Sequence, residues 1–171
     1  MNKNTLILII ILILAIVGIY FCQQSLLQVK DYKNISYNIE GKDVLLTNGL
    51  SEVEIVPGSA SKSITRYFGN EVRGDFNNDK SEDVAFLLTQ DNGGSGTFYY
   101  VVAALKTNNG YIGTNGIFIG DHVAPQTTEF RDNMIIVNYE DREINQPMTA
   151  QPSIGFSKYC MIENGKLIDK E

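Results

Sequence analysis

The chain has 171 residues, of which 43% are apolar and 20% are charged, and its formal net charge is −6. This length and composition predict one globular domain with room for a short additional segment. An acidic chain without a basic stripe repels phosphate groups, which argues against a nucleic-acid partner, whereas its carboxylates favour cations.

Residues 5–22, "TLILIIILILAIVGIYFC", form an uncharged run of 18 positions. As a helix this run is about 27 Å long, close to the ~30 Å hydrocarbon thickness of a bilayer. We therefore predict a transmembrane signal anchor that follows a cytoplasmic tail of residues 1–4. A cleaved signal peptide and a lipid attached to Cys22 are the alternatives, but both require small residues near the end of the run, where Tyr20 and Phe21 stand.

The orientation of the anchor follows from its very short N-terminal tail, which is typical of a signal anchor. The flanking positive charges are nearly balanced, with Lys3 before the run and Lys30 and Lys33 after it. We expect a single-pass inner or cytoplasmic membrane protein. Residues 23–34 are interpreted as a juxtamembrane linker, and residues 35–171 as an extracytoplasmic β domain.

Beyond the linker, β-branched and aromatic residues alternate with short turn signals, and no long window has clean helical periodicity. The predicted fold is mainly β: a single antiparallel β domain, either a sandwich or a curled sheet, with about nine strands. The candidate strands cover residues 35–40, 43–47, 51–56, 63–72, 83–90, 97–105, 111–120, 133–140 and 153–163, and the chain closes with "NGKLI", a two-residue turn signal followed by a short strand.

Two segments stand out within this pattern. "FYYVVAAL", residues 98–105, is apolar at every position, so we expect Val101, Val102, Ala103 and Ala104 to be buried on both faces of a central strand. Residues 141–153, "DREINQPMTAQPS", predict a long polar loop of the kind that often carries function.

The stretch "GDFNNDKSEDVAFLL", residues 74–88, has an oxygen-bearing side chain at every second position before an apolar run. The five positions are Asp75, Asn77, Asp79, Ser81 and Asp83. Calcium prefers six to eight oxygen ligands at about 2.3–2.6 Å, so this spacing predicts a calcium site that uses four side chains and the Ser81 carbonyl. Phe86 stands where an EF-hand has its bidentate glutamate, and the flanks predict strands, so the loop is not an EF-hand.

The core "GDFN.D...D" resembles the D-x-[DN]-x-D-G-x-x-D calcium loops of FG-GAP and VCBS-type β repeats. Position 6 of that pattern is usually glycine, because its backbone is left-handed, but here it is Lys80. The alternative reading is a solvated turn without an ion, since Asp and Asn favour turns by themselves.

A wider resemblance covers residues from about 35 to 158. The segments "RYFGNEVRGDFNNDKSEDVAFLLTQDNGGSGTFYYVVAAL", "GDHVAPQTTEF", "IIVNYEDRE" and "QPMTAQPS" resemble a family of small bacterial envelope proteins that carry an N-terminal signal or membrane anchor. The resemblance implies a β fold and an envelope location. It implies no activity, because none is assigned to that family.

Catalytic chemistry is weakly represented. His122 is the single histidine, it follows Asp121, and no G-x-S-x-G motif accompanies it. Cys160, inside a predicted strand, is interpreted as a small buried hydrophobe. The carboxylates of "YEDRE", residues 139–143, are interpreted as a solvated charged turn.

The expected function is a membrane-anchored, non-catalytic β module, stabilised by calcium, that binds an envelope protein or a glycan. The alternative is an envelope hydrolase that uses His122 with Glu140 or Asp141. A concave pocket uniting these residues with a nucleophile favours the enzyme, whereas a shallow face of Tyr and Asn side chains favours the module.

Overall fold

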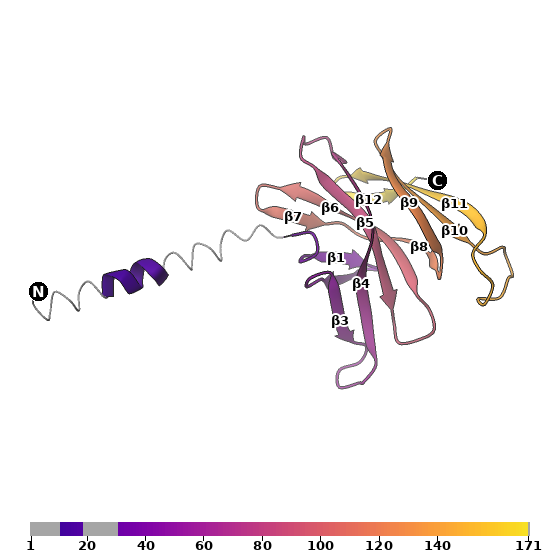
Figure 1. Ribbon diagram of the computed structural model, residues 1–171, viewed down its shortest axis with the longest axis horizontal. Helices are drawn as coiled ribbons and strands as arrows, with labels where there is room; N and C mark the ends of the chain where they lie inside the picture. Colours follow the sequence, from indigo (N-terminus) through magenta and orange to yellow (C-terminus); the bar gives the residue numbers. More distant parts are fainter. Residues whose placement is uncertain (1–10, 19–30, 171) are drawn as a thin grey trace, which may run out of the picture.

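The computed structural model describes residues 11–18 and 31–170 of the chain. Residues 11–18 form a helix, and the strands of the described chain lie within residues 36–169 (Figure 1). Every strand pairing among them is antiparallel. The expectation of a mainly β, antiparallel domain is therefore confirmed.

The predicted anchor is described only in its middle. Residues 5–10 and 19–22 of that run lie outside the described residues, as do the tail 1–4 and most of the linker, residues 23–30. Among the residues that are described, no helix has both the length and the apolar character needed to cross a membrane.

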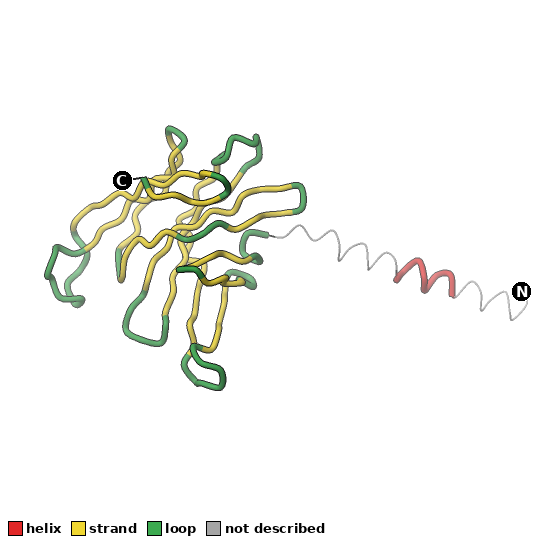
Figure 2. The backbone as a smooth tube through the Cα atoms, turned by 180° about the vertical axis from the view of Figure 1, so that it is seen from behind, coloured by secondary structure: helices red, strands yellow, loops and turns green. Residues whose placement is uncertain are grey.

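Twelve strands of the described chain form two sheets and a separate hairpin (Figure 2). The central sheet contains β3 (Leu50–Glu54), β4 (Lys62–Gly74), β5 (Asp83–Asp91), β6 (Phe98–Thr107) and β7 (Gly110–Gly113) in that order, with β8 (Ile117–Asp121) also paired to β6. The covering sheet has the order β12 (Lys166–Asp169), β11 (Ile154–Glu163), β10 (Met134–Asp141) and β9 (Ala124–Arg131). The hairpin consists of β1 (Ser36–Ile39) and β2 (Lys42–Leu45).

The central sheet is buried on both faces, because the covering sheet packs on one face and the β1–β2 hairpin packs on the other. Val101 and Ala103 of β6 belong to the first core, and Val102 and Ala104 belong to the second. All four side chains are fully buried, which confirms the prediction that "FYYVVAAL" is a central strand.

The predicted strand 111–120 is divided into β7 and β8, which pair with opposite ends of β6. Thr114 fills the gap between them: the amide of Ala103 donates to its Oγ1 (3.0 Å), and its own amide donates to the Ala103 carbonyl (2.9 Å). The β1–β2 hairpin crosses this break so closely that a Cβ on Gly113 would collide with the Ser36 carbonyl oxygen. The hairpin can therefore pack this closely against β7 because residue 113 is a glycine without a side chain.

Strand β9 was not predicted, because its sequence "APQTTEFR" is mostly polar and begins with a proline after Ala124. In the structure β9 lies at the edge of the covering sheet, where it pairs with β10 alone. Pro125 stands beside an irregularity in that pairing, between Asn138 and Tyr139. An edge strand tolerates a proline and exposed polar side chains, since one side of it needs no hydrogen-bonded neighbour.

Candidate functional site

The loop between β4 and β5 contains the five residues expected to bind calcium. Asp75 closes the loop, because its Oδ1 accepts a hydrogen bond from the amide of Asp79 (3.0 Å) and its Oδ2 accepts one from the amide of Lys80 (2.8 Å). Oδ1 of Asn77 also accepts from the Asp79 amide (3.0 Å), and Oδ1 of Asp79 accepts from the amide of Ser81 (2.7 Å). The structure therefore brings these four residues together in one tight turn.

The backbone of this turn is left-handed at two non-glycine residues, Asn78 (φ 62°) and Lys80 (φ 68°). A left-handed conformation is what the calcium-loop pattern requires at its sixth position, which Lys80 occupies. The lysine adopts it at a cost of about 1 kcal/mol relative to glycine.

Asp83 has a different position from the other four residues. Its side chain is fully buried, and its two oxygens accept hydrogen bonds from the amides of Phe76 (3.0 Å) and Lys106 (2.8 Å). Burial raises the pKa of Asp83, although these two hydrogen bonds act in the opposite direction. The carboxylate thus fastens the loop and the end of β6 to the start of β5.

The donor set of the loop fits calcium in chemical type, because it consists entirely of oxygen atoms. Within residues 11–18 and 31–170, however, no three or more His, Cys, Asp or Glu side chains are arranged to hold a metal ion. A calcium ion in this loop would bind the carboxylates of Asp75, Asp79 and Asp83, which already accept hydrogen bonds from backbone N–H groups. Such sharing is chemically allowed, since each carboxylate oxygen has a second lone pair.

His122 lies in the turn between β8 and β9, at a positive φ of 53°. Its Nδ1 is 2.6 Å from Oδ1 of Asp121, which also accepts the amide of Thr97 (2.8 Å). Arg142 brings the 141–153 loop to this turn, donating from Nη1 to the His122 carbonyl (3.0 Å) and from Nε to the Ala150 carbonyl (2.7 Å). The 141–153 loop therefore contacts His122 through the side chain of Arg142, which binds the backbone carbonyl of the histidine.

No nucleophile completes this arrangement among the described residues. None of their hydrogen bonds joins the imidazole of His122 to a serine, threonine or cysteine side chain. Cys160 is fully buried in the core, as predicted, and burial raises the pKa of its thiol to about 12. A thiol in that environment is protonated and inert.

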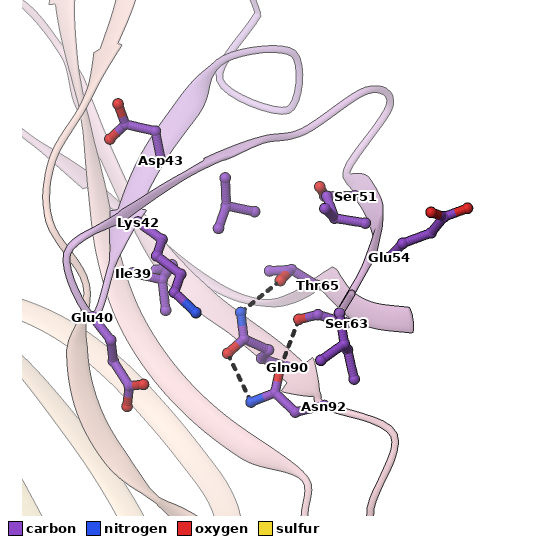
Figure 3. Close-up of a pocket in the computed structure, with 13 residues that line it drawn as sticks. Ile39, Glu40, Lys42, Asp43, Ser51, Glu54, Ser63, Thr65, Gln90 and Asn92 are labelled. Carbon is purple, nitrogen blue, oxygen red and sulfur yellow. Dashed lines mark hydrogen bonds between the residues drawn. The ribbon is translucent and has the colours of Figure 1, made fainter. Parts of the chain in front are cut away.

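A cavity of about 360 Å³, called the trough below, opens between the β1–β2 hairpin and β3 (Figure 3). Its floor is the face of β4 and β5 that the hairpin leaves uncovered. Along β5 this face presents Val84, Phe86 and Leu88 beneath the hairpin, and then Gln90 in the trough. The face changes from apolar to polar where the cover ends, as expected if the uncovered part meets water or a ligand.

The floor side chains form a chain of hydrogen bonds, drawn in Figure 3. Ser63 Oγ donates to Asn92 Oδ1 (2.6 Å), Asn92 Nδ2 donates to Gln90 Oε1 (3.3 Å), and Gln90 Nε2 donates to Thr65 Oγ1 (3.0 Å). Thr65 and Gln90 are only 2% and 8% exposed. Their mutual contacts hold the amide and hydroxyl groups at fixed positions.

The walls and the rim of the trough differ from its floor. The walls are aliphatic, formed by Ile39 and Val44 on the hairpin side and by Val53 and Ile55 on the β3 side. The charged residues of the lining are Glu40, Lys42, Asp43 and Glu54, so the rim is negative overall. The carboxylates are oriented by hydrogen bonds from Tyr100, Asn38 and the amide of Gly58, respectively.

A tyrosine cluster that sequence reasoning missed attaches the start of the described domain to the central sheet. The hydroxyls of Tyr32 and Tyr67 both donate to Oε1 of Glu71, at 2.6 and 2.7 Å. The ammonium of Lys33 lies 3.8 Å from the centre of the Tyr67 ring. Tyr32 and Lys33 fall in the segment interpreted as a linker, and their residue types alone carry no signal of this contact.

No match to this chain is found among protein-family models, curated proteins or solved structures. The geometry described above is therefore the basis for a functional assignment.

Proposed function

We propose that this chain is a non-catalytic binding module of the bacterial cell envelope, anchored in the membrane by residues 5–22 and carrying its β domain outside the cytoplasm. The observation that carries the proposal is the trough, a cavity with a fixed polar floor and aliphatic walls. A concave site with a few convergent polar groups is the usual form of a ligand site.

Within the described part of the chain no catalytic group is assembled, which supports binding over hydrolysis. Neither His122 nor Cys160 lines the trough, and among the described residues His122 has no hydroxyl or thiol partner. The floor of the trough consists of amides and hydroxyls, which recognise a ligand without acting as bases at neutral pH.

Two features of the sequence support the location. The uncharged run 5–22 matches the length of a membrane-spanning helix, and its residues 11–18 are helical with exposed apolar side chains. The resemblance to anchored envelope proteins points to the same compartment. A calcium ion in the 75–83 loop is part of the proposal, and its support is the all-oxygen donor set and the left-handed backbone of Lys80.

The test is binding of the full chain, in detergent micelles, to a purified envelope fraction of the source bacterium. The chain is expected to sediment with the fraction, and Val53→Arg, which narrows the trough, is expected to abolish this. Val53 is 58% exposed, so the larger side chain does not disturb the core. Ile112→Arg is the matched control, because Ile112 is equally exposed (61%) and lies outside the trough lining. Equal sedimentation of wild type and Val53→Arg would contradict the proposal.

A further inference from the structure

The trough combines three chemical features that together restrict its ligand. The floor is neutral and polar, the walls are aliphatic, and the rim is negative overall. Resting on the proposed function, we propose that the trough binds a neutral saccharide.

The floor supplies hydrogen-bonding groups of both kinds. A primary amide has two N–H donors and a carbonyl oxygen with two lone pairs. The chain of bonds from Ser63 to Thr65 uses one N–H of Gln90 and one of Asn92. Among the described residues no hydrogen bond uses the second N–H of either amide, so these two donors are left for a ligand. Hydroxyl groups of a sugar match such a floor, because each of them both donates and accepts.

The walls suit the other surface of a sugar ring. The C–H groups of a pyranose form an apolar face, which can pack against the side chains of Val44, Val53 and Ile55. A wholly apolar ligand would leave the second N–H of Gln90 and of Asn92 without a partner, which costs free energy. The volume of about 360 Å³ is near the lower end of ligand sites, which span about 300–1,000 Å³, so it suits a short saccharide.

The net charge of the lining disfavours anionic ligands. Glu40, Asp43 and Glu54 outnumber the single lysine, Lys42, in the lining, although Lys42 is the charged residue that points toward Gln90 in Figure 3. A uronate or a phosphorylated sugar would be repelled by these carboxylates at low ionic strength. A neutral saccharide has no such penalty.

The test is a titration of the full chain in detergent micelles, followed by NMR of the side-chain amides. The probes are di- and trisaccharides of glucose, of galactose and of N-acetylglucosamine, with digalacturonate as the anionic control and a lysine-rich peptide as the competing class. At least one neutral saccharide is expected to shift the Gln90 and Asn92 amide signals saturably in the millimolar range. Digalacturonate is expected to cause no shift.

Variants identify the site. Val53→Arg and Gln90→Met are expected to weaken saccharide binding by at least about tenfold. Ile112→Arg and Gln126→Met, made at exposed positions outside the trough, should bind as wild type. Melting curves of all four establish that they fold, and Val53→Arg remains informative if Gln90→Met does not. Saccharide binding that is unchanged in Val53→Arg would overturn the proposal.

The outcomes separate this inference from the proposed function. In one outcome no neutral saccharide binds, but the chain sediments with the envelope fraction in a manner that depends on the trough and is lost after protease treatment of that fraction. This outcome overturns the saccharide proposal and leaves the proposal of a binding module standing. Saturable binding of the lysine-rich peptide alone would likewise overturn the saccharide. If neither saccharide nor envelope fraction binds, both proposals fail.

Discussion

The hydroxyl of Tyr32 donates a 2.6 Å hydrogen bond to Oε1 of Glu71, across 39 positions of the chain. This bond joins the first described residues of the domain to β4 of the central sheet. Tyr67 donates to the same oxygen, so one carboxylate fixes two aromatic rings. Tyr32, at the start of the described domain, is thereby held against the central sheet.

Removing this bond is expected to lower the free energy of unfolding. Tyr32→Phe should cost about 1 kcal/mol, because a hydrogen bond to a charged group is lost while the ring remains. Tyr159→Phe is the matched control, since Tyr159 is an exposed tyrosine of the covering sheet, and it should change stability by less than about 0.5 kcal/mol. Denaturant unfolding of the full chain in detergent, followed by circular dichroism, measures both. Equal effects would show that the Tyr32 hydroxyl contributes nothing.

The same cluster predicts a dependence on pH. Burial by itself raises the pKa of Glu71, but hydrogen bonds from Tyr32 and Tyr67 and the charges of Lys33 and Arg73 outweigh it, so the pKa is lowered overall. Stability from ionised Glu71 is thus present above its unfolded pKa, near 4.3, and is lost as the pH falls through the lower folded value. The stability difference between wild type and Glu71→Gln should be full at neutral pH and should shrink below about pH 4.

At alkaline pH the stability of the same cluster is expected to fall as the pH rises, because Tyr32 loses its proton. Burial and the hydrogen bond to Glu71 raise the pKa of Tyr32 to about 12. The contribution of neutral Tyr32 is therefore full below its unfolded pKa of about 10 and is lost as the pH rises through about 12. If the difference in unfolding free energy between wild type and Tyr32→Phe stays constant from pH 10 to about pH 12, the raised pKa of Tyr32 is contradicted.

The second prediction concerns the central strand β6. Val102→Asp places a carboxylate without a partner between the central sheet and the β1–β2 hairpin, which should cost several kcal/mol. Since total stability is typically about 5–15 kcal/mol, the variant should be largely unfolded or insoluble. Ile112→Asp, at an exposed position of β7, should fold as wild type. A soluble variant with a native melting curve would show that this face of β6 meets water.

The third prediction tests the 75–83 loop. The proposed calcium ion would bind only the folded loop, so calcium should raise the melting temperature of the full chain. We expect a dissociation constant of ~10⁻⁴–10⁻³ M, which is typical of extracellular modules. Calcium at ten times this dissociation constant then adds about 1.4 kcal/mol to the free energy of unfolding, which raises the melting temperature by a few degrees. Asp79→Ala should abolish the response, whereas Glu82→Ala, in the same loop but outside the alternating pattern, should keep it. Identical melting curves in chelator and in several millimolar calcium would mean that the loop is a polar turn.

The fourth prediction concerns topology. Protease added to intact spheroplasts should digest the β domain and leave a membrane-bound stub that contains residues 5–22. Lysed membranes serve as the control, because they expose both faces to the protease. A domain protected until lysis would reverse the orientation, and a mature chain that begins near residue 23 would replace the anchor with a cleaved signal.

Local patterns in the sequence determined the class of the fold and whether an individual strand is buried on one face or on both. In "FYYVVAAL" no polar residue occurs on either face, so burial on both sides followed without knowledge of the partners. The alternation of Asp75, Asn77, Asp79 and Ser81 likewise predicted a tight loop, because Asp and Asn side chains hydrogen-bond to nearby amides, as they do here. Such features depend on neighbours within a few residues.

The tertiary structure alone decided what covers each face of the central sheet. The side chains of Thr65 and Gln90 meet 25 positions apart, and their polar character has meaning only because the β1–β2 hairpin stops short of them. Strand β9 could not be recognised, since only its edge position makes a polar run with Pro125 acceptable. The trough and the tyrosine cluster are likewise set by long-range packing, which residue types and spacing do not encode locally.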